Sequence, residues 1–148
     1  MSGQIKKLWM NQLNVEARAA QVYTVAAFDL FDILGPVEIV KLGGYVTAAA
    51  VGATEVRITV NGVNVDAAAV AINGAVGTVV LSCLNVAGTL INAAAIPQTV
   101  ATLTTMVSGQ GAAAAGAITA TFSVGTSWTG VWFVEYRKLS PFSSITAA

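Results

Sequence analysis

Alternating apolar and polar residues recur along most of the chain and predict β-strands. The clearest segment is 55–60, where three β-branched apolar residues alternate with three polar residues. Asn61-Gly62 follows this segment, and both residue types tolerate the positive φ that a type I′ turn requires. The sequence therefore predicts a tight β-hairpin at Asn61-Gly62.

Other segments carry the same signal, and Gly or Pro separates several of them. Gly43-Gly44 is expected to end or bend one strand, and the Ala-rich stretches compete with the strand signal because Ala favours helix. Many short strands of this kind indicate an all-β, single-domain, antiparallel β-sandwich or barrel, jelly-roll-like in form. The further expected strands are 18–28, 37–42, 45–49, 77–84, 99–107, 117–124 and 130–137.

The first 20 residues follow a different pattern. Ile5, Trp9 and Leu13 recur at helical spacing, with Leu8 beside them. This spacing is typical of a short amphipathic helix packed on its own domain. It is equally compatible with an extended arm whose apolar side chains dock into a partner. We therefore divide the chain into an N-terminal arm or short helix at 1–20 and a β domain at 21–148.

The composition changes this picture from an isolated domain to an assembling one. Charged residues make up 9% of the 148 residues and hydrophobic residues 55%, whereas about 25% is charged in an ordinary soluble domain. No Asp, Glu, Lys or Arg lies between Ala67 and Val134. A surface this poor in charge favours association, so we expect copies of the chain or other proteins to cover much of it.

Two other classes of partner fit the sequence less well. The seven basic and seven acidic residues cancel, which leaves no net field to attract nucleic acid. A membrane-spanning helix needs about 20 mostly apolar residues, but the most apolar stretch, 67–91, is interrupted by Asn73, Ser82 and Asn85. We expect neither nucleic acid nor a membrane as the partner.

The sequence contains few of the residues that catalytic sites use. The chain has no histidine, the usual general base near neutral pH, and its one cysteine, Cys83, is interpreted as a small buried apolar residue. Asp29 and Asp32 are the only closely spaced carboxylates, and they resemble the solvated edge of an apolar segment. We therefore expect no enzyme, no metal site and no cofactor.

An aromatic group near the C-terminus has two interpretations. Trp128, Trp132, Phe133 and Tyr136 lie close together in sequence, with a composition that would suit a platform for sugars or peptides. At strand spacing, such residues more often form a core or a subunit interface. We favour the second interpretation for all four.

Several segments resemble those of small head proteins of tailed bacteriophages, over about two-thirds of the chain from Leu34 on. A Gly-Pro-Val-x-Ile strand leads there into a Gly-x-Val-Thr strand. The aromatic residues and small-residue tail at the end of this chain are similar to the way such chains finish, although Leu-x-Pro stands here where the family has an adjacent Pro-Leu. The residues that carry this resemblance are 35–39 (Gly-Pro-Val-Glu-Ile), 42–47 (Leu-Gly-Gly-Tyr-Val-Thr), Trp132, Tyr136, Leu139, Pro141 and 147–148.

This resemblance implies a capsid decoration, or cement, protein. Such proteins sit on the outer shell of the virion, typically as homotrimers, and clamp neighbouring copies of the major capsid protein. Under this hypothesis the apolar residues Ile5, Leu8, Trp9 and Leu13 contribute to capsid contact. The alternative function is another virion part, such as a tail-tube, head-fibre or carbohydrate-binding adhesin module.

Overall fold

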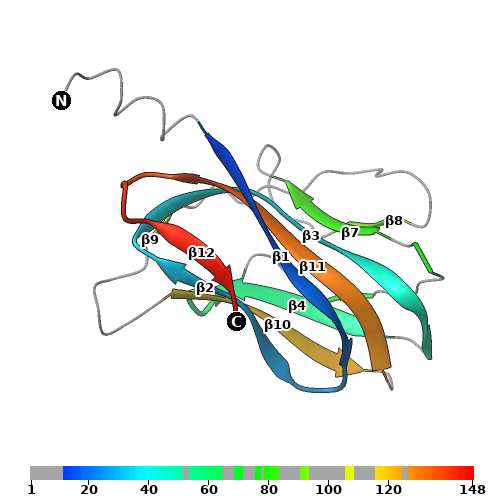
Figure 1. Cartoon of the computed structure of the whole chain (residues 1–148). Helices are drawn as coiled ribbons and strands as arrows, with labels where there is room; N and C mark the ends of the chain where they lie inside the picture. The colour runs from blue at the N-terminus through cyan, green and yellow to red at the C-terminus, as the bar shows by residue number, and fades with distance from the viewer. Residues whose placement is uncertain are drawn as a thin grey trace.

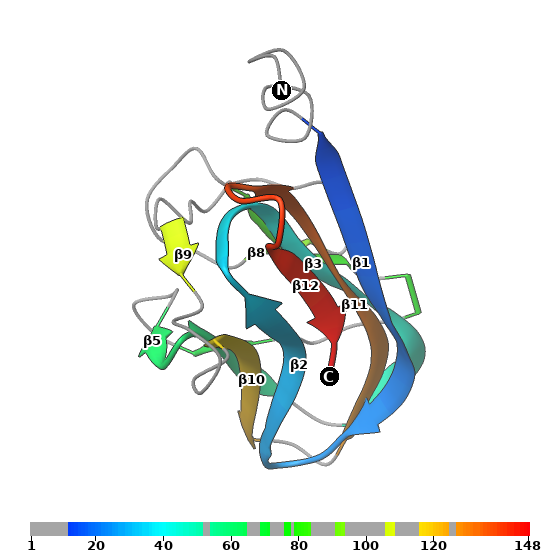
Figure 2. The same cartoon turned by 60° about the vertical axis from the view of Figure 1, so that its left-hand side comes forward.

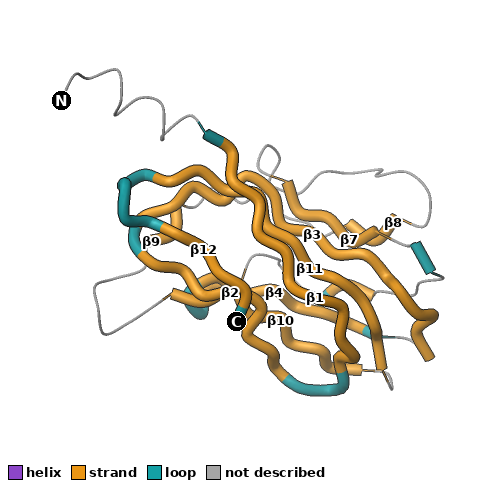
Figure 3. Tube along the Cα trace, in the orientation of Figure 1, coloured by secondary structure: helices purple, strands orange, loops and turns teal. Residues whose placement is uncertain are grey.

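The protein is all-β throughout the part of the chain that its structure describes. The structure, a computed structural model, describes residues 12–51, 54–64, 69–71, 76–77, 79–83, 91–93, 106–108, 116–124 and 127–148. Every regular element in these ranges is a strand, and they contain no helix (Figure 3). The predicted fold class is confirmed.

Sheet A forms one layer of the molecule. Its strand order is β1-β11-β3-β7-β8, with β9 paired to β3 outside this path, and every pair is antiparallel. The strands are β1 (Leu13–Tyr23), β3 (Pro36–Val51), β7 (Val79–Cys83), β8 (Ile91–Ala93), β9 (Met106–Ser108) and β11 (Ser127–Lys138).

Sheet B forms the other layer. Its order is β12-β2-β10-β4-β5, with β6 paired to β4, and all of these pairs are also antiparallel. The strands are β2 (Ala27–Leu34), β4 (Glu55–Val60), β5 (Val63–Asn64), β6 (Val70–Ala71), β10 (Gly116–Val124) and β12 (Ser144–Ala147).

The two sheets lie face to face as a sandwich, not as a closed barrel (Figures 1 and 2). Early strands pair with late strands, β1 with β11 and β2 with β10, while β1, β2, β3 and β4 alternate between the sheets. A long antiparallel hairpin rolled over itself gives this order, which is that of a jelly roll. The first strand, β1, and the last strand, β12, therefore lie near each other, and Glu16 of β1 accepts the backbone N–H of Ala147 in β12.

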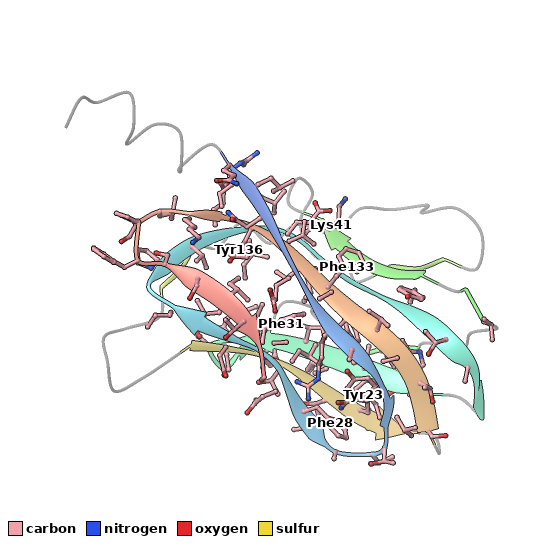
Figure 4. The ribbon with its side chains drawn as sticks, viewed as in Figure 1. Tyr23, Phe28, Phe31, Lys41, Phe133 and Tyr136 are labelled. Atoms are coloured by element: carbon pink, nitrogen blue, oxygen red, sulfur yellow. The ribbon has the colours of Figure 1, made fainter. Side chains whose placement is uncertain are left out.

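The hydrophobic core fills the space between the two sheets. Side chains alternate between the two faces of a strand, so every second residue of a strand points toward this core. On β10 and β11 every second side chain is buried, including Phe122, Trp128 and Trp132. Tyr23 brings a further ring to this cluster, with its centroid 5.0 Å from that of Phe122 and 5.4 Å from that of Trp128. Figure 4 shows Tyr23 and Phe28 reaching this space from β1 and β2.

The predicted hairpin is confirmed. Asn61 has a φ of 50° and Gly62 a φ of 77°, as a type I′ turn requires at both central positions. Val60 pairs with Val63 across the turn. The backbone N–H of Asn61 also donates to the carbonyl of Ala117 at 2.9 Å, which ties the turn to β10.

The division of the chain into strands differs from the prediction at two places in its first third. The expected strand at 18–28 is divided by a bend at Thr24–Ala26, because Tyr23 and Phe28 belong to opposite sheets yet reach the same core. The strand interrupted by Gly43-Gly44 is instead continuous as β3. Gly44 is retained in the strand because the Trp132 ring lies against its backbone.

The start of the chain also differs in part. Residues 1–11, and with them Ile5, Leu8 and Trp9, lie outside the described residues. Residues 13–20, expected in the arm or helix, belong to β1, in which Leu13 pairs with Arg137 of β11. The helical interpretation is therefore wrong from Leu13 onward, because strand pairing with β11 satisfies this backbone.

Candidate assembly surface

The outward side chains of sheet A form a mostly apolar surface. On β11, Val131 and Phe133 alternate with the buried tryptophan and valine side chains, so they point away from sheet B. Tyr45 of β3 pairs with Val131, and Ala17 of β1 pairs with Phe133. We call these four residues, with Leu13, Val15 and Val22 of β1 and the four charged residues described below, the sheet A outer face.

The edge strand β1 contributes the most exposed part of this face. Leu13, Val15 and Val22 are 46%, 61% and 57% exposed, and Tyr45 on β3 is 42% exposed. Exposing apolar side chains to water is unfavourable. A contiguous patch of them on a protein surface therefore marks an interaction site. The cross-strand pairing joins Ala17 to Phe133 and Val131 to Tyr45, while Leu13 and Val15 pair with the charged residues Arg137 and Glu135 of β11.

The charges on the sheet A outer face neutralise each other. Arg137 Nη1 lies 3.1 Å from Glu38 Oε2, and Lys41 Nζ lies 3.5 Å from Glu135 Oε2. The Arg137–Glu38 and Lys41–Glu135 ion pairs are therefore both on this face. The signs alternate along each strand and across each row, so the four charges form a two-by-two checkerboard with no net charge.

The outward side chains of sheet B are different in kind. Asp29 and Asp32 on β2 are both exposed, and Asp29 Oδ1 accepts a hydrogen bond from Thr119 Oγ1 at 2.8 Å. Thr119 pairs in turn with Thr59 of β4, and Thr146 of β12 pairs with Asp32. Sheet B therefore presents mainly hydroxyl and carboxylate groups to water, and its exposed apolar side chains Leu34 and Val63 lie on β2 and β5, with β10 and β4 between them. Sheet A exposes more apolar side chains, which makes it the candidate assembly surface.

The aromatic group predicted from the sequence is divided between the core and this surface. Trp128 and Trp132 are 0% exposed and pack against each other with ring centroids 5.4 Å apart, while Tyr136 is also buried. Fully buried indoles cannot stack on a sugar at the surface. Phe133 alone of the four is half-buried on the sheet A outer face, close to Lys41 in Figure 4.

Glu16 and Arg18 of β1 join the two sheets, and we call this pair of residues the edge clasp. The sequence did not indicate their role. Arg18 Nη1 donates to the carbonyl oxygens of Asp29 and Leu30 in β2. Glu16 Oε1 accepts the backbone N–H of Ala147 in β12 at 3.2 Å. These inward charges join β1 of sheet A to the backbone of sheet B, at a side of the sandwich where no strand among the described residues links the two sheets.

Removal of the clasp should open this side of the sandwich. We expect Arg18→Met, which keeps the apolar stem, to lower the free energy of unfolding by about 1–2 kcal/mol, because it loses charge-assisted hydrogen bonds to β2. Urea unfolding measures the loss. The matched control is Lys138→Met at the end of β11, with an expected change within about 0.5 kcal/mol; equal losses in both variants would contradict the clasp.

The carboxylates singled out in the sequence lie exposed on one strand of the described part of the chain. Asp29 and Asp32 lie on β2 as the expected solvated edge, and no three His, Cys, Asp or Glu residues among the described ones could together hold a metal ion. Cys83 ends β7. The described residues also include no helix of the length and apolarity that a membrane span needs.

Comparison of the chain with protein-family models, curated proteins and solved structures finds no match.

Proposed function

We propose that this chain is a non-catalytic structural protein of a virus particle, a decoration (cement) protein. It binds the outer surface of a phage capsid as a homo-oligomer and stabilises the shell through contacts with the major capsid protein. The alternative of another virion part is distinguished by the location of the protein on the particle.

The difference between the two outer faces is the observation that carries this proposal. Sheet B presents mainly threonine and aspartate to water, with Leu34 and Val63 exposed on β2 and β5, whereas sheet A presents a larger set of valine, leucine and aromatic side chains beside charges that are already paired. Covering such a face is favourable by about 25 cal/mol per Å² of apolar area, less the cost of immobilising the partners. A protein whose work is to hold other proteins together needs such a face.

Two further features support the proposal. The segments 35–39 and 42–47, which carry the resemblance to phage head proteins, make up most of β3 and the bend before it, in the middle of sheet A. The jelly roll is also common among viral capsid domains. A fold alone does not determine function, so the arrangement of the surface carries more weight than the topology.

The proposal predicts a specific effect of Trp9. In particles of the virus that encodes this chain, we expect Trp9→Ala to reduce capsid occupancy at least several-fold, because a buried indole is a typical hot spot of protein interfaces. Occupancy is measured by quantitative gel analysis of purified particles. The conservative control, Trp9→Phe, should keep most of the occupancy.

Three results bear on this prediction. Normal occupancy of Trp9→Ala would refute the role of the arm residues. Loss of occupancy with an unfolded isolated protein would assign Trp9 to the fold instead, so circular dichroism of the isolated variant is part of the test. Absence of the wild-type protein from the capsid surface in electron micrographs would overturn the proposed function itself.

A further inference from the structure

We propose that the sheet A outer face packs against the same face of a second copy of this chain, about a two-fold axis that lies in the interface. This inference rests on the proposed function, because it names the surface through which the homo-oligomer forms. The second copy is selected by the arrangement of charge on the face, by its apolar rows and by the contrast with sheet B.

The charge checkerboard is complementary to itself. Arg137 and Glu38 form one row, Glu135 and Lys41 the next, with Arg137 and Glu135 on β11 and the other two on β3. A two-fold axis along the strands, between β11 and β3, places each β11 charge over the opposite charge of its own row in the second copy. An axis across the strands, between the two rows, also places positive over negative.

This complementarity favours a second copy over simpler occupants. A highly charged partner would be attracted to a face that carries a net charge of the opposite sign. The four charges on the sheet A outer face sum to zero. A partner with a purely apolar surface would remove water from both ion pairs and offer them no new polar contacts, which is unfavourable. A second copy gives each charge a further opposite charge at the moment water is removed, and this combination suits an isologous contact.

The apolar rows lie beside the checkerboard on the same strands. Ala17 and Phe133 form the next row, and Val131 with Tyr45 the one after, so the apolar part of the face extends from the charged part without a break. Two sheets that pack face to face keep their strands within about 30° of each other. That geometry lets rows of one copy lie along rows of the other while sheet B remains in water.

The contact determines the expected number of copies. An isologous contact closes with two copies, so the isolated full-length protein should have twice the 15.0 kDa mass of the chain. The homotrimer implied by the resemblance would instead need a contact between two different surfaces. The mass of the native assembly therefore separates the two arrangements.

Sedimentation equilibrium of the purified full-length protein tests this inference, with the dimer dissociation constant as the measured quantity. Lys41→Glu places a negative charge opposite a negative charge for either axis, and Val15→Lys replaces an exposed apolar side chain at the β1 end of the Glu135–Lys41 row by a charged one. We expect each to raise the dissociation constant by about tenfold or more. The matched control is Thr146→Lys on the exposed edge strand of sheet B, which should leave the constant unchanged.

The outcomes are distinct. A trimer or a stable monomer, or equal dissociation constants for Lys41→Glu and wild type, would overturn this inference. Loss of association through misfolding is recognised by the urea unfolding curve, and Lys41→Gln, which removes one charge without repulsion, should then give an intermediate dissociation constant. Capsid occupancy is measured separately: a dimer that does not bind capsids overturns the proposed function and keeps this inference, whereas capsid binding by a trimer does the reverse.

Discussion

Gly130→Ala is expected to lower the free energy of unfolding by about 3 kcal/mol, at the upper end of the range for overpacking a core. A Cβ at this position would meet the carbonyl oxygen of Tyr45 at 2.4 Å and the Trp128 ring at 2.4 Å. One contact is with the backbone of the neighbouring strand β3, and the other is with one of the largest fully buried side chains. Neither neighbour can move without disturbing the sheet or the core.

The sign of this effect follows from two opposing magnitudes. Replacing a glycine by alanine in a compatible conformation stabilises a protein by about 0.4–1 kcal/mol, because the unfolded chain loses conformational freedom. Gly130 has no positive φ, so this gain applies. It is smaller than the cost of displacing Trp128, whose ring contacts Tyr23, Phe122 and Trp132 within the aromatic cluster.

Thermal unfolding provides the measurement. A loss of about 3 kcal/mol corresponds to a decrease in Tm of roughly 6–12 °C for a chain of this size. The graded control is Gly44→Ala, whose Cβ would meet the carbonyl oxygen of Val131 at 2.9 Å and the Trp132 ring at 3.1 Å, and which should lose less. A Gly130→Ala protein as stable as Gly44→Ala would show that Trp128 does not lie over Gly130 as described.

The parts of the fold that were predicted correctly are those set by local pattern. The hairpin at Asn61-Gly62 needs only two residues that tolerate positive φ between alternating segments. Likewise β4, β10 and β11 have a clear period of two, with one side chain in every two buried. Local geometry determines these elements, so the sequence was sufficient to predict them.

β1 could be predicted only in part, because two periodicities overlap at its start. Leu13 continues a helical spacing from Ile5 and Trp9, yet it also begins an alternation in which Leu13, Val15 and Ala17 face water. In this alternation the polar side chains point inward, against the usual rule for a sheet with one wet face. Their partners are backbone groups of β2 and β12, and no local signal indicates contacts so distant in sequence.

The composition predicts that the protein has an assembly surface, but it does not predict where on the fold that surface lies. A charge content of 9% predicts that partners cover the protein, and it does not indicate which face they cover. That depends on register, since a slip of one residue would exchange Phe133 for Trp132 on the outer side. The irregularity between Glu135 and Tyr136 also aligns the charges into a checkerboard, and sequence patterns do not predict such irregularities.

Tyr23→Phe is expected to be as stable as the wild type at pH 7, or more stable by about 1 kcal/mol. The Tyr23 side chain is fully buried, and its hydroxyl has no hydrogen-bond partner among the described residues. A buried polar group without a partner is unfavourable, and phenylalanine keeps the ring contacts with Phe28 and Phe122. A loss of more than 1 kcal/mol at pH 7 would mean that the hydroxyl does contribute a bond.

The larger effect of Tyr23→Phe should come at alkaline pH. Burial raises the pKa of Tyr23 to about 12 from its ordinary value of 10.0, partly offset by the positive charge of Arg18. Between these two values the unfolded chain loses the phenolic proton while the folded chain keeps it, so wild-type stability falls as pH rises. The shift corresponds to about 2–3 kcal/mol, and urea unfolding at several pH values should show Tyr23→Phe gaining this much over wild type from pH 10 to 12. Parallel pH profiles for the two proteins would place the Tyr23 hydroxyl in water rather than in the core.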